Sequence, residues 1–316
     1  MTWGPVLGVL APFLLGLFLV VYCAERLVKG TLGTALGFGV STFLVSVIFI
    51  GFDPENLAVG AVAAADGLPG IALGSIIGAA MVAIGLAFGL TAVLCPMRFE
   101  PVPRQVLAVA VLAVVALWLL SADGRLSRAD GTLLFLGYVV AVWYLRHLGR
   151  RGLDVQPTGE AAEELEEAQA LPRWKALRLF LLSLVGLVLG SELLVFASER
   201  VIVWLSLSET VFGMTVLAFV VSIEELAREL PAAMRGRPEI SFGNVVGSIL
   251  AFFLFNGGII ALVRPVAVEA TVLQFYLPVC LATVAVIVAF MLTSTVPRWA
   301  GVILLALYGL FVVGAH

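Results

Sequence analysis

The chain has 316 residues, of which 62% are hydrophobic and only 12% are charged, and its formal net charge is −3. Soluble domains are about 45–50% apolar and about 25% charged, and a soluble fold of this size could not bury so much apolar surface. The composition therefore excludes a soluble protein and predicts that a bilayer is the solvent for most of the chain. No basic patch is present, which excludes a nucleic-acid partner.

The cysteines and histidines do not indicate a resident metal. Cys23, Cys95 and Cys280 are far apart, while His147 and His316 lie at a predicted helix end and at the last position. This spacing fits neither a disulfide framework nor a histidine metal site, and no nucleophile–base pair stands out. We therefore expect no cofactor and no enzyme activity.

Apolar runs long enough to cross about 30 Å of hydrocarbon recur about ten times. The predicted membrane helices are 5–27, 35–65, 70–94, 103–120, 129–147, 174–203, 208–234, 238–263, 268–292 and 297–314. The second run is too long for one simple crossing and contains Gly51 and Pro54, so a break or kink is predicted there. The first run is predicted to remain as a helix, because it lacks the basic start and the cleavage site of a signal peptide.

The basic residues predict the orientation of these helices. With the N-terminus outside, thirteen Lys and Arg residues fall in cytoplasmic loops and only four fall outside. Cytoplasmic loops of membrane proteins carry an excess of Lys and Arg, so both termini are predicted to be outside. The expected location is the plasma (inner) membrane of a prokaryote.

One long polar loop divides the chain. We expect a first five-helix half at 1–147, a cytoplasmic acidic linker at 148–173 and a second five-helix half at 174–316. The acidic run Glu160 to Glu167 is typical of a solvated linker, with regulatory metal binding as the minor alternative.

An internal repeat relates the two halves. After a shift of 169 residues (225 − 56), the segment Phe43 to Ala79 lies on Phe212 to Ser248 without a gap. Identities occur at glycine, proline and glutamate positions, which chance matches between apolar helices rarely share. Because the copies are five predicted crossings apart, they are expected to be inverted, with repeat segments at about 37–94 and 206–263. Inverted repeats are typical of secondary transporters, whose substrate site lies where the repeats meet.

Several carboxylates fall inside the predicted helices. Asp53, Glu55, Glu224, Glu225 and Glu229 would each be costly in hydrocarbon, so they are expected to face a cavity or a partner. Carbonyl groups freed near the predicted break could add hard oxygen ligands, which suit sodium, calcium, manganese or a proton relay. An alternative for Glu224 and Glu229 is simple neutralisation by Arg228.

The second copy resembles a known family. It reads Ser222-Ile-Glu224-Glu225-Leu226, followed by Gly243-Asn244-Val-Val-Gly247-Ser248. This is similar to the α-repeat of the calcium/cation antiporter superfamily, the sodium/calcium-exchanger-like proteins, with its G-T-S-x-P-E-L and G-N-x-x-G-S-N motifs. The resemblance implies an all-α integral membrane fold of about ten transmembrane helices in two inverted repeats of five. It also implies a cation pathway lined by Glu225, Ser222 and Ser248.

The first copy places Asn56, Asp53 and Ala79 at the matching positions. The predicted cation-binding set is Glu225, Asp53, Asn56, Ser222, Ser248, Glu55 and Glu224, with Glu225 and Asp53 as the metal-ligating carboxylates. The family's threonines are replaced by Phe52 and Val221, and its later Asn or Asp positions by Ala83 and Phe252.

Four glycines have the small-xxx-small spacing that lets membrane helices approach closely, namely Gly74, Gly78, Gly243 and Gly247. Ser75 and Asn244 are expected to hydrogen-bond across that contact. These six residues form the predicted packing or gate set.

The leading hypothesis is a secondary active antiporter that exchanges calcium or another small cation for sodium or protons by alternating access. One alternative is a proton-linked monovalent or transition-metal exchanger, because several family ligands are replaced. Another is a non-transporting membrane scaffold that kept the fold. The expected partners are membrane lipid and small inorganic cations, and the oligomeric state stays open.

Overall fold

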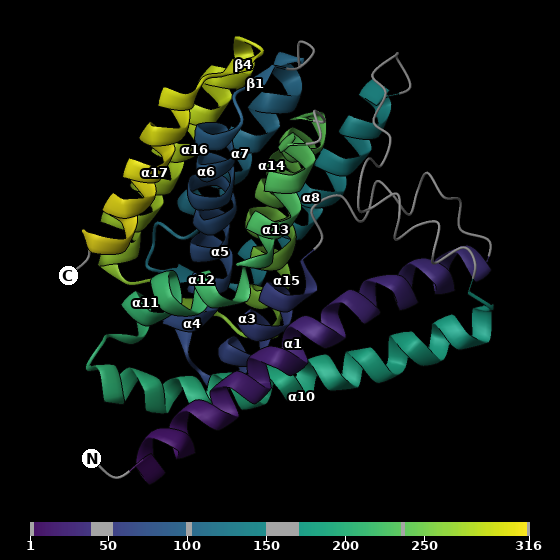
Figure 1. The fold of residues 1–316 in the computed structure, drawn as a ribbon, viewed down its shortest axis with the longest axis vertical. Helices are drawn as coiled ribbons and strands as arrows, with labels where there is room; N and C mark the ends of the chain where they lie inside the picture. Colours follow the sequence, from purple (N-terminus) through teal and green to yellow (C-terminus); the bar gives the residue numbers. More distant parts are fainter. Residues whose placement is uncertain (1–2, 39–52, 99–102, 150–170, 235–237, 315–316) are drawn as a thin grey trace.

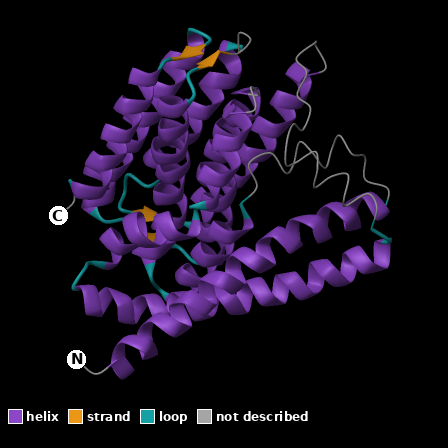
Figure 2. Ribbon diagram, viewed as in Figure 1, coloured by secondary structure: helices purple, strands orange, loops and turns teal. Residues whose placement is uncertain are grey.

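A computed structural model describes residues 3–38, 53–98, 103–149, 171–234 and 238–314. The chain is almost entirely helical, as Figures 1 and 2 show, so the all-α class is confirmed. The strands are two residues long and join neighbouring helices. The acidic run Glu160 to Glu167 and residues 39–52 of the predicted helix 35–65, including Phe52, lie outside the described residues.

The elements of the first half follow the predicted runs. They are α1 (Trp3–Gly37), α3 (Pro54–Asp66), α4 (Pro69–Leu73), η1 (Gly74–Gly78), α5 (Ala79–Met81), η2 (Val82–Ala87), α6 (Phe88–Leu94), β1 (Met97–Arg98), α7 (Arg104–Leu120), β2 (Arg125–Leu126) and α8 (Arg128–Gly149). The segments labelled η are π-helical turns within longer helices. Helix α3 begins at Pro54, where a break was predicted, because proline fits the first turn of a helix.

The second half is also made of helices joined by short strands. Its elements are α10 (Arg173–Leu205), α11 (Glu209–Val211), η3 (Phe212–Leu217), α12 (Ala218–Val221), α13 (Glu224–Met234), α14 (Pro238–Leu250), η4 (Ala251–Asn256), α15 (Gly257–Val263), β3 (Val266–Ala267), η5 (Val272–Tyr276), α16 (Leu277–Leu292), β4 (Thr295–Val296) and α17 (Arg298–Val313).

Three predicted helices have different bounds. Of the run 35–65, residues 35–37 belong to α1, and the next described helix, α3, begins at Pro54. The run 208–234 was predicted as one helix, but it is interrupted at Ser222 and Ile223, and α13 begins afresh at Glu224. No glycine or proline marks this interruption. The first helix was predicted to end at residue 27, but α1 continues to Gly37. Helix α10 packs along this extension, since a Cβ on Gly30 would lie 2.5 Å from the backbone nitrogen of Phe180.

Six described helices are long and apolar enough to cross a membrane, namely Gly8–Gly37, Pro69–Leu94, Arg173–Leu205, Glu209–Pro231, Gly243–Val263 and Val272–Leu292. Helices Arg104–Leu120 and Arg298–Val313 are apolar but shorter. The most apolar stretch of Pro69–Leu94 is 94% buried inside the protein, against 28% for Gly8–Gly37. Helix Pro69–Leu94 is therefore a core element, whereas helix Gly8–Gly37 exposes most of its surface.

Helices α1 and α10 lie side by side and cross one end of the bundle formed by the other helices (Figure 1). Their contact is close because small residues of each helix meet the backbone of the other. A Cβ on Gly16 would lie 2.6 Å from the backbone nitrogen of Leu194, and one on Gly190 would lie 3.0 Å from the backbone nitrogen of Val20. These two helices therefore form a tight pair.

Several helix boundaries of the first half fall on helix boundaries of the second half when the sequence is shifted by 169 residues. The π-helical segment Val82–Ala87 falls on Ala251–Asn256, and the helix ends Leu94 and Val263 coincide. The strands also pair reciprocally between the halves. Strand β1 pairs with β4, and β3 pairs with β2, both antiparallel.

Candidate functional site

The start of α3 carries a buried polar cluster. Asp53 has an extended backbone (φ −126°, ψ 92°) and caps the helix, because its Oδ1 accepts a hydrogen bond from the backbone N–H of Asn56 at 2.8 Å. Its Oδ2 accepts a second bond from Asn56 Nδ2 at 2.9 Å. Both side chains are almost completely buried. An Asp cap followed by a proline is a local helix-start signal, so the sequence itself places these two residues together.

This cluster extends into the second half. Asn56 Nδ2 also donates to Ser222 Oγ at 2.9 Å, although 166 residues separate the two. Ser222 is fully buried and ends α12, at the interruption that precedes α13. The start of α3 therefore meets the interrupted helix of the other half through polar side chains. We call Asp53, Asn56 and Ser222 the inter-half cluster.

A second set of polar contacts joins α13 to α14. Asn244 Nδ2 donates to Glu225 Oε2 at 2.7 Å and to Glu229 Oε1 at 3.1 Å. Both carboxylates are buried, and Asn244 is half-buried. One amide group thus contacts two buried carboxylates that are one helical turn apart on α13.

The other predicted cation-binding residues also have defined places. Glu55 is buried in the first turn of α3, Ser248 is buried on α14, and Glu224 is half-buried at the start of α13. Among the described residues, no three His, Cys, Asp or Glu side chains form a group that could hold a metal. Of the replaced family positions, Ala83, Val221 and Phe252 are buried.

The glycines of the packing set behave differently in the two halves. A Cβ on Gly74 would overlap the carbonyl group of Gly213, and one on Gly78 would lie 2.6 Å from the carbonyl oxygen of Met214. The prediction of close packing does not hold for Gly243, because no described atom lies within 4 Å of a Cβ placed there. Gly247 is buried.

The two polar members of the packing set also differ. Ser75 Oγ was expected to bond across the helix contact, but it donates to Ala72 O of its own helix at 2.8 Å. A serine side chain is short enough to return to its own backbone, and this satisfies the hydroxyl locally. Asn244, in contrast, reaches from α14 to α13.

Three further residues were not singled out from the sequence as site residues. Glu229 was expected to face a cavity or a partner, with neutralisation by Arg228 as the alternative, but it was not included in the predicted cation-binding set. Glu209 Oε1 accepts the backbone N–H groups of Gly70 at 2.6 Å and of Ile71 at 3.4 Å, so a side chain of one half caps a helix of the other. Asn256 is fully buried, and its amide atoms have no hydrogen-bond partner among the described residues. The only indication of Asn256 in the sequence is that it is an asparagine within an apolar run.

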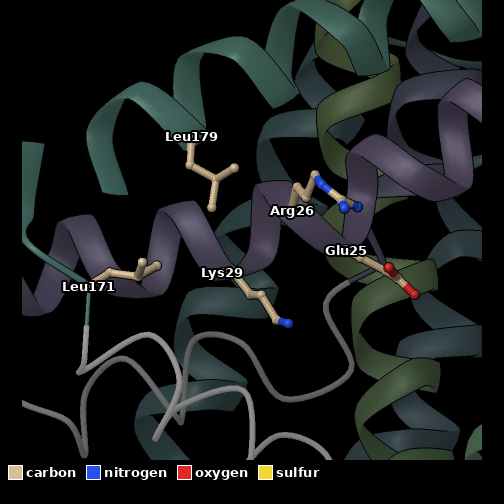
Figure 3. Close-up of a pocket in the computed structure, with 5 residues that line it drawn as sticks. All are labelled: Glu25, Arg26, Lys29, Leu171 and Leu179. Carbon is tan, nitrogen blue, oxygen red and sulfur yellow. The ribbon is translucent and has the colours of Figure 1, made fainter. Parts of the chain in front are cut away.

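A cavity of about 280 Å³ lies beside α1 (Figure 3). Glu25, Arg26, Lys29, Leu171 and Leu179 line it, and Figure 3 shows Arg26 and Lys29 leaving α1 in different directions. Two cationic side chains against one carboxylate disfavour a cation there. The polar sets around Asn56 and Glu225 are therefore the better candidates for a cation pathway.

Comparison with known proteins supplies the family context. The family model described as sodium/calcium exchanger protein matches residues 8–146 and 175–315. An uncharacterised membrane protein of Methanocaldococcus jannaschii is 30% identical over 298 residues, which cover 94% of each chain. The sodium/calcium exchanger MaX1 of Methanosarcina acetivorans is 26% identical over 340 aligned positions, with 95% of this chain and 96% of the relative covered. The solved structure of the sodium-calcium exchanger NCX_Mj superposes with a TM-score of 0.61 at 26% identity, covering 96% of both chains.

Proposed function

Because the chain belongs to the sodium/calcium exchanger protein family, we propose that it is a secondary active antiporter that exchanges a small cation for sodium or protons. Its relatives are named as exchangers and antiporters, so the protein is a cation transporter of the membrane rather than an enzyme. The observation that carries the proposal is the inter-half cluster. It places oxygen-bearing side chains of both halves in contact inside a helical membrane protein.

The proposed architecture is ten membrane crossings in two inverted halves, 1–147 and 174–316, with 148–173 as a cytoplasmic acidic linker. The matching π-helical segments at 82–87 and 251–256 support a structural repeat. The reciprocal pairing of β1 with β4 and of β3 with β2 supports a two-fold relation between the halves, since a two-fold axis exchanges equivalent contacts. Both termini are proposed to lie outside a prokaryotic plasma membrane.

The proposed cation pathway runs past Asp53, Asn56 and Ser222 to Glu225, with Glu55, Glu224 and Ser248 as further oxygen donors beside it. Carboxylate, amide and hydroxyl oxygens are the ligands that calcium and sodium prefer. Burial supports this role, because carboxylates within membrane helices mark ion pathways by default. Alternating access would expose this region to each side of the membrane in turn.

Calcium is the first candidate substrate and a monovalent cation is the second. The second candidate is favoured by Phe252, a fully buried aromatic side chain where the family has an oxygen ligand. Calcium takes six to eight oxygen ligands. A site in which Phe252 replaces an oxygen ligand therefore suits a cation that needs fewer ligands.

The test is flux into proteoliposomes that contain the purified protein. Calcium, manganese and sodium uptake are each recorded under an imposed sodium or pH gradient. Wild type is expected to take up at least one of these cations in exchange for sodium or protons that move down the imposed gradient, and Glu225→Gln is expected to abolish this exchange while the protein stays folded. The control is Glu199→Gln, which changes an exposed carboxylate. Unchanged uptake in Glu225→Gln would refute the site, and no uptake by wild type would favour a non-transporting scaffold.

A further inference from the structure

We infer that Asn256 is a further oxygen ligand of the transported cation, supplied by the second half about one helical turn beyond Phe252. The inference rests on the proposed function and adds a residue to its pathway. Its basis is a side chain that is fully buried and whose Nδ2 and Oδ1 have no hydrogen-bond partner among the described residues. Burying an amide without a partner is costly, so such a group calls for a bound water or ion.

Two contacts fix how α15 lies against α3. Arg264 Nη1 donates a hydrogen bond to Ala65 O at 2.8 Å. About one turn earlier on both helices, a Cβ on Gly60 would lie 2.5 Å from Ile260 Cδ1. Because the residue numbers fall together along both helices, α3 and α15 run in the same direction. The π-helical segment η4, which leads into α15, also packs against α3.

This register brings Asn256 to the level of the inter-half cluster. Asn256 is four residues before Ile260, and Asn56 is four residues before Gly60. Residues four apart lie on one face of an α-helix, so Asn256 and Asn56 follow the Ile260–Gly60 contact on the facing sides of the two helices. Asp53 adds a buried carboxylate there, bonded to Asn56 at 2.9 Å. The oxygens of Asp53 and Asn256 therefore belong to the same part of the pathway.

The local backbone does not require an asparagine at this position. Asn256 ends the π-helical segment Ala251–Asn256, and Ala87 ends the equivalent segment Val82–Ala87. The first half thus forms the same π-helical turn with an alanine, which is also fully buried. The amide is particular to the second half, and neither the repeat nor the turn explains it.

The neighbouring Phe252 gives the amide a role. Phe252 is a fully buried aromatic side chain at a position where the family has an oxygen ligand. Asn256 follows it by about one turn and returns an oxygen to the same part of the helix. Asparagine side-chain oxygens are among the ligands that calcium takes in proteins. Because the amide is neutral, it serves calcium or sodium without selecting the charge of the ion.

The experiment separates cation binding from flux, using the full chain in detergent and in proteoliposomes. Titration calorimetry with calcium chloride and with sodium chloride gives the affinities, and thermal midpoints are recorded in a choline chloride buffer with a chelator. Asn256→Leu removes the amide at similar size, whereas Asn256→Asp keeps an oxygen at the same place. Thr283→Val is the matched control, because this buried hydroxyl bonds to Val279 O of its own helix at 2.8 Å.

We expect Asn256→Leu to weaken the affinity for the cation that wild type binds by roughly tenfold or more, the scale of one interaction between a charged group and a polar partner. Its thermal midpoint without cations should equal or exceed that of wild type, because the unpaired amide is gone. Asn256→Asp and Thr283→Val should keep the affinity within a few-fold of wild type.

Three results would overturn the inference. They are wild-type affinity in Asn256→Leu, an equal loss in Asn256→Leu and Asn256→Asp, and a lower midpoint of Asn256→Leu without cations. The first would leave the amide to a buried water, and the other two would make it a structural group. Flux by wild type and by Asn256→Leu at equal rates and affinities would keep the proposed antiport and reject the ligand. Binding that depends on Asn256 without any flux would refute the antiport and leave the inference standing.

Discussion

Asn56 donates a hydrogen bond from Nδ2 to Ser222 Oγ at 2.9 Å, and the same nitrogen donates to Asp53 Oδ2 at 2.9 Å. Both N–H groups of one amide thus join the start of α3 to the interruption after α12. Because buried polar groups are costly when left without partners, this arrangement ties the local geometry of one half to that of the other. The proposed cation pathway depends on this connection.

The connection predicts energetic coupling between Asn56 and Ser222. Asn56→Ala and Ser222→Ala should each destabilise the protein, and the double variant should lose less than the two single losses combined, with a coupling of roughly 0.5–3 kcal/mol. Denaturation of the purified protein measures all three variants against wild type. Additive losses would contradict the hydrogen bond, and Ser206→Ala, at an exposed helix end, is the control.

The different surroundings of two equivalent glycines predict opposite tolerance of a methyl group. Gly74→Ala should destabilise the protein by about 1–3 kcal/mol, because a Cβ there would overlap the backbone of Gly213 and helices would have to separate. Gly243→Ala is the matched control and should be neutral or stabilising by up to about 1 kcal/mol, since alanine is the better helix former. Thermal unfolding midpoints test both. Similar midpoints for the two variants would contradict the close contact between the backbones of Gly74 and Gly213.

The contact of Glu209 with α4 predicts a capping role between the halves. Glu209→Ala removes the acceptor for the backbone N–H groups of Gly70 and Ile71, and a loss of about 0.5–2 kcal/mol is expected by analogy with helix caps. Glu199→Ala, at an exposed position, should have little effect. Hydrogen exchange at Gly70 and Ile71, followed by mass spectrometry, should rise in the first variant only. Unchanged exchange there would show that the carboxylate does not cap α4.

The proposed orientation predicts which loops a membrane-impermeant maleimide can reach. In a background without Cys23, Cys95 and Cys280, a cysteine at Ala122 should be labelled from outside intact cells. A cysteine at Lys175 should be labelled only after permeabilisation. Both positions are exposed, so access depends on the side of the membrane rather than on burial. The reverse pattern would invert the proposed topology.

The amino-acid sequence by itself determined the membrane class and most helix positions, because apolar length is a local property that the bilayer selects directly. It also determined the start of α3, since Asp53 and Pro54 are adjacent and form a helix-start signal without outside help. The motif around Glu225 and Asn244 was likewise enough to indicate the family that the family model then matched.

The tertiary structure decided the features that depend on contacts between residues far apart in the sequence. Gly74 and Gly243 occupy equivalent places in the repeat, but only Gly74 has a neighbouring backbone at its Cβ position among the described residues. The interruption at Ser222 has no glycine or proline to announce it, and its serine is bonded to Asn56 of the other half. The bridge from Asn244 to Glu225 and Glu229 required α13 and α14 to be packed together. Sequence patterns report the preferences of neighbouring residues, whereas these contacts arise only when packing brings separate helices within hydrogen-bonding distance.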